Sequence, residues 1–177
     1  MAVLGKICSE HGSFFMDIQI RKSTPDEVPA IVRLMREFAE YENLGEYCEI
    51  TEERLFDVMF GDDAFVEGLV AFHEKQPVAY AMFYPYFASF RGQCGYYLED
   101  IFVAEDFRRN GLGEAMVKII AKLAMQRGYE RIDFQVLEWN APAVKFYEKL
   151  GAIRDDSERH FKFIDNSFSS LVAGEPV

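Results

Sequence analysis

A short polar segment with two glycines lies between a predicted strand and a predicted long helix. It reads Arg108, Arg109, Asn110, Gly111, Leu112, Gly113 and Glu114. The first turn of a helix has N–H groups without intrahelical partners and a partial positive charge, and glycines let a phosphate approach the backbone closely. Position and residue types together therefore predict a diphosphate-binding loop. A turn that only connects two elements is the alternative interpretation.

Two common nucleotide-binding motifs do not fit this segment. A P-loop needs Gly-Lys-Ser/Thr, where this chain has Gly113, Glu114 and Ala115. The dinucleotide-binding fingerprint needs a third glycine, where Met116 stands. The loop is therefore expected to bind its diphosphate in another way.

Two carboxylates, Glu99 and Asp100, occur in an otherwise apolar stretch just before this loop. Their neighbours Leu98, Ile101 and Val103 predict burial, and buried carboxylates are costly unless they are paired or functional. A salt bridge to Arg or Lys is the alternative role for either one. Because adjacent strand residues point to opposite faces, the two can share a pocket only if the strand is bulged.

The first half of the chain must position these residues. An alternating pattern at 18–20 predicts a strand, and Thr24 with Glu27 predicts a capping box at the start of a helix. Apolar residues at helical spacing continue that helix to Tyr41. A second short helix is predicted over 51–61, between a threonine cap and a glycine stop.

The second half changes its periodicity twice. Apolar runs at 65–72, 78–87 and 96–103 predict an antiparallel meander, and helical spacing over 116–124 predicts a long helix. The remaining elements are predicted as a strand at 131–136, a helix at 140–150 and a strand at 160–164 in a final hairpin. This order predicts an α/β fold with a mixed, mostly antiparallel sheet of six to seven strands and helices on both faces.

Composition limits the function classes. The chain of 177 residues fits one domain, and its net charge of -11 disfavours binding to nucleic acid. Its three cysteines lie far apart, which indicates neither a disulfide framework nor a zinc site and fits a reducing compartment. No apolar run is long enough for a membrane span, so we expect a cytoplasmic protein without membrane partners.

The segments around the loop resemble the GNAT superfamily of N-acetyltransferases. Its signature, Arg/Gln-x-x-Gly-x-Gly/Ala, is matched by Arg108, Gly111 and Gly113. Residues 97–103 upstream extend the resemblance, which points to the diamine acetyltransferase branch with the spermidine/spermine and thialysine enzymes. The downstream matches are Trp139, Asn140, Pro142, Phe146, Tyr147, Gly151 and Ala152.

The resemblance implies an acetyl-coenzyme A donor, a GNAT-like fold and a homodimer without a required metal. The acetyltransferase domain would span 16–165, with a C-terminal tail at 166–177. Residues 1–15 show no clear period, so they are expected to be a peripheral extension or the product of an upstream start. The whole loop would hold the diphosphate of the cofactor. The other implied cofactor-binding residues are Ile101, Phe102, Val103, Asn140, Pro142, Ala143 and Tyr147.

The resemblance also implies the catalytic roles. Glu99 would act as the general base that accepts a proton from the amine through a water molecule, and Tyr147 as the acid that protonates the leaving thiolate. Tyr41, Glu42, Glu99 and Asp100 would bind a small cationic amine such as a polyamine, a diamine or a thialysine-like amino acid. The alternatives are a protein or peptide N-acetyltransferase and a non-catalytic acyl-coenzyme A-binding regulatory module.

Overall fold

The computed structural model of this chain describes residues 2–11 and 14–173. Contacts between residues divide the chain into a large first unit, residues 1–135, and a small second unit, residues 136–177. The first unit contains the described sheet and the helices α1 (Val28–Tyr41), α2 (Glu52–Phe60) and α3 (Leu112–Gln126). The second contains α4 (Ala141–Lys149) and α5 (Asp165–Ala173).

The described strands form one six-stranded sheet in chain order, β1 to β6. All neighbouring strands are antiparallel except β5 and β6, which are parallel. The sequence prediction of a mixed, mostly antiparallel sheet is confirmed. The strands are β1 (Gly5–His11), β2 (Phe14–Lys22), β3 (Glu67–His73), β4 (Gln76–Ala88), β5 (Gln93–Val103) and β6 (Arg131–Asp133).

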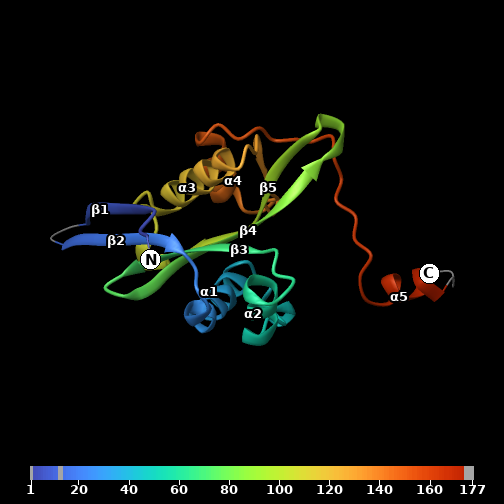
Figure 1. Cartoon of the computed structure of the whole chain (residues 1–177), viewed down its shortest axis with the longest axis horizontal. Helices are drawn as coiled ribbons and strands as arrows, with labels where there is room; N and C mark the ends of the chain where they lie inside the picture. Colours follow the sequence, from blue (N-terminus) through green and yellow to red (C-terminus); the bar gives the residue numbers. More distant parts are fainter. Residues whose placement is uncertain (1, 12–13, 174–177) are drawn as a thin grey trace. The chain divides into compact units, whose positions relative to one another are not determined.

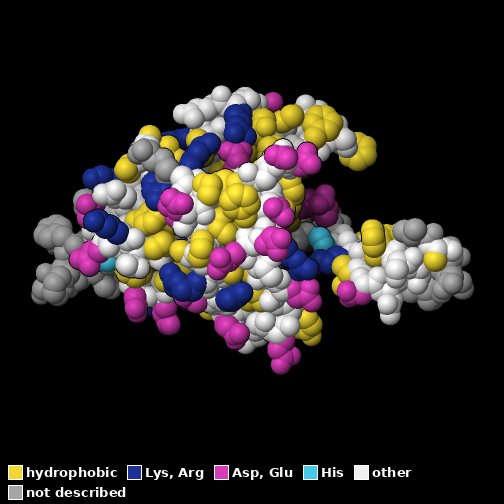
Figure 2. Space-filling view, turned by 60° about the horizontal axis from the view of Figure 1, so that its bottom comes forward, with side chains coloured by type: hydrophobic (Ala, Val, Ile, Leu, Met, Phe, Trp, Pro, Cys, Tyr) yellow, Lys and Arg dark blue, Asp and Glu magenta, His cyan; other side chains and the backbone are white. Residues whose placement is uncertain are grey.

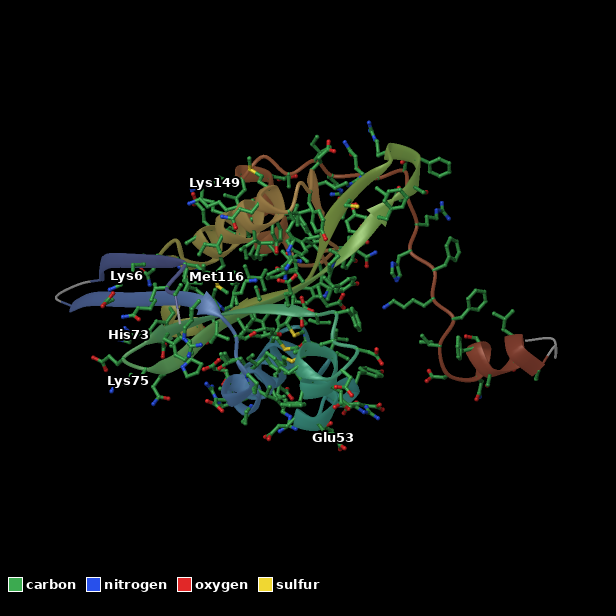
Figure 3. All side chains as sticks on the ribbon, in the orientation of Figure 1. Lys6, Glu53, His73, Lys75, Met116 and Lys149 are labelled. Atoms are coloured by element: carbon green, nitrogen blue, oxygen red, sulfur yellow. The ribbon has the colours of Figure 1, made fainter. Side chains whose placement is uncertain are left out.

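Helices cover both faces of the sheet, as the sequence predicts. α1 (Val28–Tyr41) and α2 (Glu52–Phe60) lie on one face and α3 (Leu112–Gln126) on the other (Figure 1). Alternate strand residues supply two separate cores: Val70 and Tyr80 pack with α1 and α2, whereas Leu69 and Ala81 pack with α3. Figure 3 shows Met116 on the inner side of α3, where its side chain is fully buried.

A buried carboxylate fixes the start of α1. Glu27 accepts a hydrogen bond from the backbone N–H of Thr24 at 2.6 Å, and its carboxylate pairs with Arg21. Burial alone would raise the pKa of Glu27, but the hydrogen bonds from Arg21 and Thr24 outweigh it and lower the pKa. The predicted capping box is confirmed, and it sets the direction of the helix that carries Tyr41 and Glu42 at its other end.

The N-terminal segment differs from the expected peripheral extension. β1 is an edge strand of the sheet and pairs with β2 from Gly5–Ile20 to His11–Phe14. Of its described side chains, Lys6 is exposed and Ile7 is half-buried, and an edge strand of this kind need not show the strict alternation of a strand with one buried face. Met1 and residues 12–13 of the expected extension lie outside the described residues.

The C-terminal strand prediction is wrong. The alternating segment 160–164 has no strand in the structure, and β6 ends at Asp133 although a strand is predicted to 136. Phe161 and Phe163 are exposed instead. An alternating pattern forms a strand only where a neighbouring strand accepts its hydrogen bonds, which the pattern itself does not report. The expected tail contains α5, and its residues 174–177 lie outside the described part of the chain.

Charge is distributed over the surface. On the face shown in Figure 2, acidic and basic side chains are interspersed with exposed apolar ones. None of the described helices is long and apolar enough to cross a membrane.

Candidate active site

The loop before α3 has the backbone that its glycines predict. Gly111 is the N-cap of α3 and has a φ of 76°, a left-handed conformation that favours glycine. A Cβ atom placed on Gly111 would meet no other protein atom within 4 Å, so the space beside it is open. Gly111 has no side chain with which to cap the helix, and the N–H groups of the first turn therefore suit an anionic ligand.

Asn110 gives a second indication that this loop binds a ligand. Its Nδ2 atom is buried and has no hydrogen-bond partner among the described residues. Buried polar atoms in proteins are normally hydrogen-bonded, so an unpaired donor points to a partner outside the chain. A phosphate oxygen is a suitable acceptor for an amide donor beside a helix N-terminus.

A β-bulge brings the two carboxylates of β5 to one face. Met82 of β4 pairs with Asp100 and the next residue, Phe83, pairs with Leu98, which leaves Glu99 as the extra residue of β5. Leu98 packs in the core under α3, whereas Phe102 packs in the core under α1 and α2. The bulge therefore reverses the facing of the strand. It confirms the condition under which the sequence allows both carboxylates to share a pocket.

Two tyrosines of β4 hold these carboxylates. The buried Tyr80 donates its hydroxyl hydrogen to Asp100 at 3.2 Å, and Tyr84 donates to Glu99 at 3.1 Å. Burial and the charge of Glu99 raise the pKa of Tyr84 to about 12. Both tyrosines stay neutral donors at physiological pH. Their role was missed at the sequence level, although the polar hydroxyls within the apolar run 78–87 are a usable signal.

Asp100 has the most perturbed carboxylate of the group. Burial and then the negative charge of Glu99 raise its pKa to about 6, with a further contribution from Glu42 and an opposing one from the hydrogen bond of Tyr80. Glu99 itself is exposed, so the expectation of its burial is wrong. The bulge is the reason, because the extra residue is turned out of the ladder. Two further carboxylates of the predicted amine site, Glu99 and Glu42, thus act electrostatically on Asp100.

The outer edge of β5 has no partner strand among the described residues beyond Tyr97. β6 pairs with β5 only over Gly95–Tyr97, and no other described strand pairs with that edge. The predicted cofactor-binding residues Ile101, Phe102 and Val103 follow on this stretch. Unpaired backbone groups on a strand edge can accept an extended ligand as an added strand.

The side chain of Arg108 contacts two other elements of the protein. Its Nε donates to the carbonyl oxygen of Val103 at 2.8 Å, and its guanidinium lies 4.5 Å from the ring centroid of Tyr41. The side chain is therefore engaged by the end of β5 and the end of α1. The neighbouring Arg109 is exposed and has a φ of 63°.

The second unit contains the remaining predicted residues. Asn140 is buried and caps α4, accepting a hydrogen bond from the N–H of Ala143 at 3.2 Å, which is the alternative role that its type allows. Pro142 lies in the first turn of α4 and is exposed. Tyr147 is half-buried on the same helix, with its ring 4.9 Å from that of Phe146.

A metal ion is usually held by several His, Cys, Asp or Glu side chains that lie close together. Among residues 2–11 and 14–173, no group of three or more His, Cys, Asp or Glu residues is arranged to hold a metal ion.

Comparison with known proteins identifies the family. The model of the acetyltransferase (GNAT) family matches residues 30–152, which include most of α1, the bulged strand, the loop and α4. The chain belongs to the GNAT acetyltransferase family. It is an enzyme that transfers acetyl groups, as its named relatives are.

Curated relatives of this GNAT acetyltransferase act on small amines according to their names. The thialysine N-epsilon-acetyltransferase of Sus scrofa is 35% identical over 149 residues, covering 80% of this chain and 86% of the relative. The enzyme of that name from Bos taurus is 34% identical over 143 residues, covering 76% and 84%. The L-ornithine N5-acetyltransferase of Arabidopsis thaliana is 27% identical over 179 residues, covering 76% and 78%.

Solved structures share the fold of this GNAT acetyltransferase. An integron cassette protein from the mobile metagenome of V. cholerae superposes with a TM-score of 0.75 at 21% identity, covering 88% of this chain and 97% of that one. An aminoglycoside acetyltransferase from an uncultured soil metagenomic sample has a TM-score of 0.71 at 17% identity, covering 84% and 97%. At these identities the likeness establishes the fold alone.

Gly111→Val tests the loop. The side chain would fill the open space beside the backbone and disfavour the left-handed φ, so affinity for coenzyme A should fall at least about tenfold. Isothermal calorimetry measures this. Gly92→Val is the matched control, because Gly92 also has a positive φ of 62° and open space but lies at the tip of the β4–β5 hairpin. Unchanged affinity in a folded Gly111→Val protein would contradict the assignment of the loop.

Proposed function

We propose that this GNAT acetyltransferase transfers the acetyl group of acetyl-coenzyme A to a primary amine of a small cationic molecule. The acceptor class is a thialysine-like amino acid, a diamine or a polyamine. The gathering of Glu42, Glu99 and Asp100 around one face of β5 carries this proposal, because three carboxylates attract a cation with more than one positive charge. The thialysine and ornithine enzymes among its relatives support the same class.

The residues around the loop fit acetyl-coenzyme A. The unpaired Nδ2 of Asn110, the open space at Gly111 and the first turn of α3 suit a diphosphate. The edge of β5 at 101–103 pairs with no further described strand and suits an extended amide-containing arm, with the carbonyl oxygen of Val103 already accepting a hydrogen bond from Arg108. By resemblance, Asn140, Pro142 and Ala143 belong to the same binding set. The bound donor supplies an acetyl thioester, whose carbonyl carbon is open to attack by an uncharged amine.

Asp100 is the better-placed base of the two carboxylates in the bulge. An alkylammonium has a pKa near ~10, so a carboxylate must accept its proton before the nitrogen lone pair is free. With a pKa of about 6, Asp100 is ionised at neutral pH and is a stronger base than an ordinary aspartate. Tyr80 holds it in place, and the exposed Glu99 can relay the proton to water.

Tyr147 is proposed as the acid, on the resemblance that places a tyrosine at this point of α4. Its hydroxyl would donate a proton to the leaving thiolate as the amine forms its new bond within a ternary complex. The nitrogen loses two protons as the ammonium becomes an amide: Asp100 takes the first, and the second, released as the carbon–sulfur bond breaks, replaces the proton that Tyr147 gives to the thiolate. One proton is therefore released to water in each turnover. Homodimer assembly and a location in the cytoplasm are part of the same proposal and rest on the resemblance and on the cysteine content.

The acceptor class is tested with a panel of amines. Thialysine, ornithine, spermidine and putrescine should release free thiol from acetyl-coenzyme A faster than neutral amines of similar size. Their advantage should shrink as salt rises from about 0.01 M to 1 M, because screening shortens the reach of the acidic site from about 30 Å to 3 Å. Preference for a neutral amine or a peptide amino terminus, without salt dependence, would contradict the small-cation proposal and favour a peptide acetyltransferase.

The choice of base is tested by pH profiles of two variants. Asp100→Asn should lower kcat by about 10²- to 10⁴-fold, because the proton acceptor is lost. In the wild type, kcat/KM should rise with pH through about 6 as Asp100 ionises. Glu99→Gln removes a negative charge that raises this pKa, so the acidic limb should move to lower pH while activity remains.

The exposed Glu53 on α2 supplies the control for these profiles (Figure 3), and Glu53→Gln should leave the limb in place. If Glu99→Gln abolishes turnover and Asp100→Asn does not, Glu99 is the base as the sequence resemblance implies.

The acid is tested with Tyr147→Phe, which keeps the ring and deletes the hydroxyl. If proton donation to the thiolate is lost, kcat should fall on the order of a hundredfold or more, with little change in coenzyme A affinity. Steady-state kinetics and a binding titration separate the two effects. A near-normal kcat removes Tyr147 from the mechanism, and an equal loss of affinity makes it a cofactor contact only.

A further inference from the structure

The side chain of Arg108 connects the cofactor loop with the acceptor side of the site. Its Nε donates to the carbonyl oxygen of Val103 at 2.8 Å. Its guanidinium carbon lies 4.5 Å from the ring centroid of Tyr41 and 5.4 Å from that of Phe102. Both rings are within the range of a cation–π interaction. One side chain thus bridges the last residue of α1 and the end of β5.

The two contacts of Arg108 lead to the carboxylates by separate routes. Tyr41 precedes Glu42, whose charge contributes to the raised pKa of Asp100. Phe102 packs against Tyr80 at 6.4 Å between ring centroids, and Tyr80 donates its hydroxyl hydrogen to Asp100. Arg108 therefore contacts both the end of α1, which leads to Glu42, and the end of β5, the strand that carries Asp100.

We infer that Arg108 is a positioning residue for the acceptor amine and that its side chain does not hold the cofactor. It fixes the end of α1 against β5, so that Glu42 and Asp100 keep the spacing that binds the cation. The inference rests on the proposed function of these carboxylates. The diphosphate is then left to the backbone of 110–114 and to the side chain of Asn110, which follow Arg108 in the sequence.

The geometry requires a guanidinium in particular. Arginine is planar, so it can stack on the Tyr41 ring while Nε donates to Val103 in the plane of the group. Lysine has a point charge on a flexible stem and cannot make both contacts in this way. Because Arg108 does not touch the reacting atoms, its loss should act mainly on the affinity for the acceptor.

The test compares acceptor and cofactor parameters in one set of variants. Arg108→Gln and Tyr41→Leu should each raise the acceptor KM about tenfold, while the coenzyme A dissociation constant changes less than about threefold. Arg108→Lys should recover only part of the loss. Tyr41→Phe, which keeps the ring, should recover most of what Tyr41→Leu loses. Arg91→Gln, at the exposed β4–β5 tip, is the matched control for removal of one positive charge.

A double variant decides whether the stack itself is responsible. If the two residues act through one contact, Arg108→Gln combined with Tyr41→Leu should raise the acceptor KM little more than either change alone. Multiplied effects, or a loss of coenzyme A affinity greater than the loss of acceptor affinity, would overturn the inference. Failure of the proposed function would look different, because the wild-type protein would then release no thiol with any cationic amine.

Discussion

One extra residue in β5 is the constraint on which the site depends. The strand must place Tyr96 and Leu98 in the core under α3 and Phe102 in the core under α1 and α2. A regular strand cannot do both, because its even-numbered residues would all face one way. The bulge at Glu99 resolves the conflict. Without it, Asp100 would face the apolar core under α3 and lose its partner Tyr80.

The same strand gives the two proposed ligands separate surfaces. Pairing with β6 stops at Tyr97, and no other described strand pairs with the edge of the following residues. The side chains of the bulge lie on the face of the sheet that α1 and α2 cover. A ligand on the edge and a ligand on the face would therefore meet at the same few residues, as a direct transfer within a ternary complex requires.

The partners of the carboxylates explain why they suit proton transfer. The alternative role weighed from the sequence, an ion pair with Arg or Lys, is absent for Glu99 and Asp100 in the part of the chain that the structure describes. A cation would lower the pKa of either group. Tyrosine hydroxyls hold the carboxylates in place as neutral donors, so burial and mutual repulsion still raise the pKa of Asp100.

The sequence by itself determined the family, the order of the central elements and the loop, because these depend on local signals. Glycine at a left-handed position, a capping box and a change of hydrophobic period are each visible within a few residues. The tertiary structure decided which strands pair and which side chains contact one another. β1 is an edge strand because β2 offers it hydrogen bonds. The segment 160–164 forms no strand, and its alternating pattern could not show whether a neighbouring strand would be present. The exposure of Glu99, the perturbed Asp100 and the contact of Arg108 with Tyr41 depend on residues far apart in the chain, and only the folded arrangement brings them together.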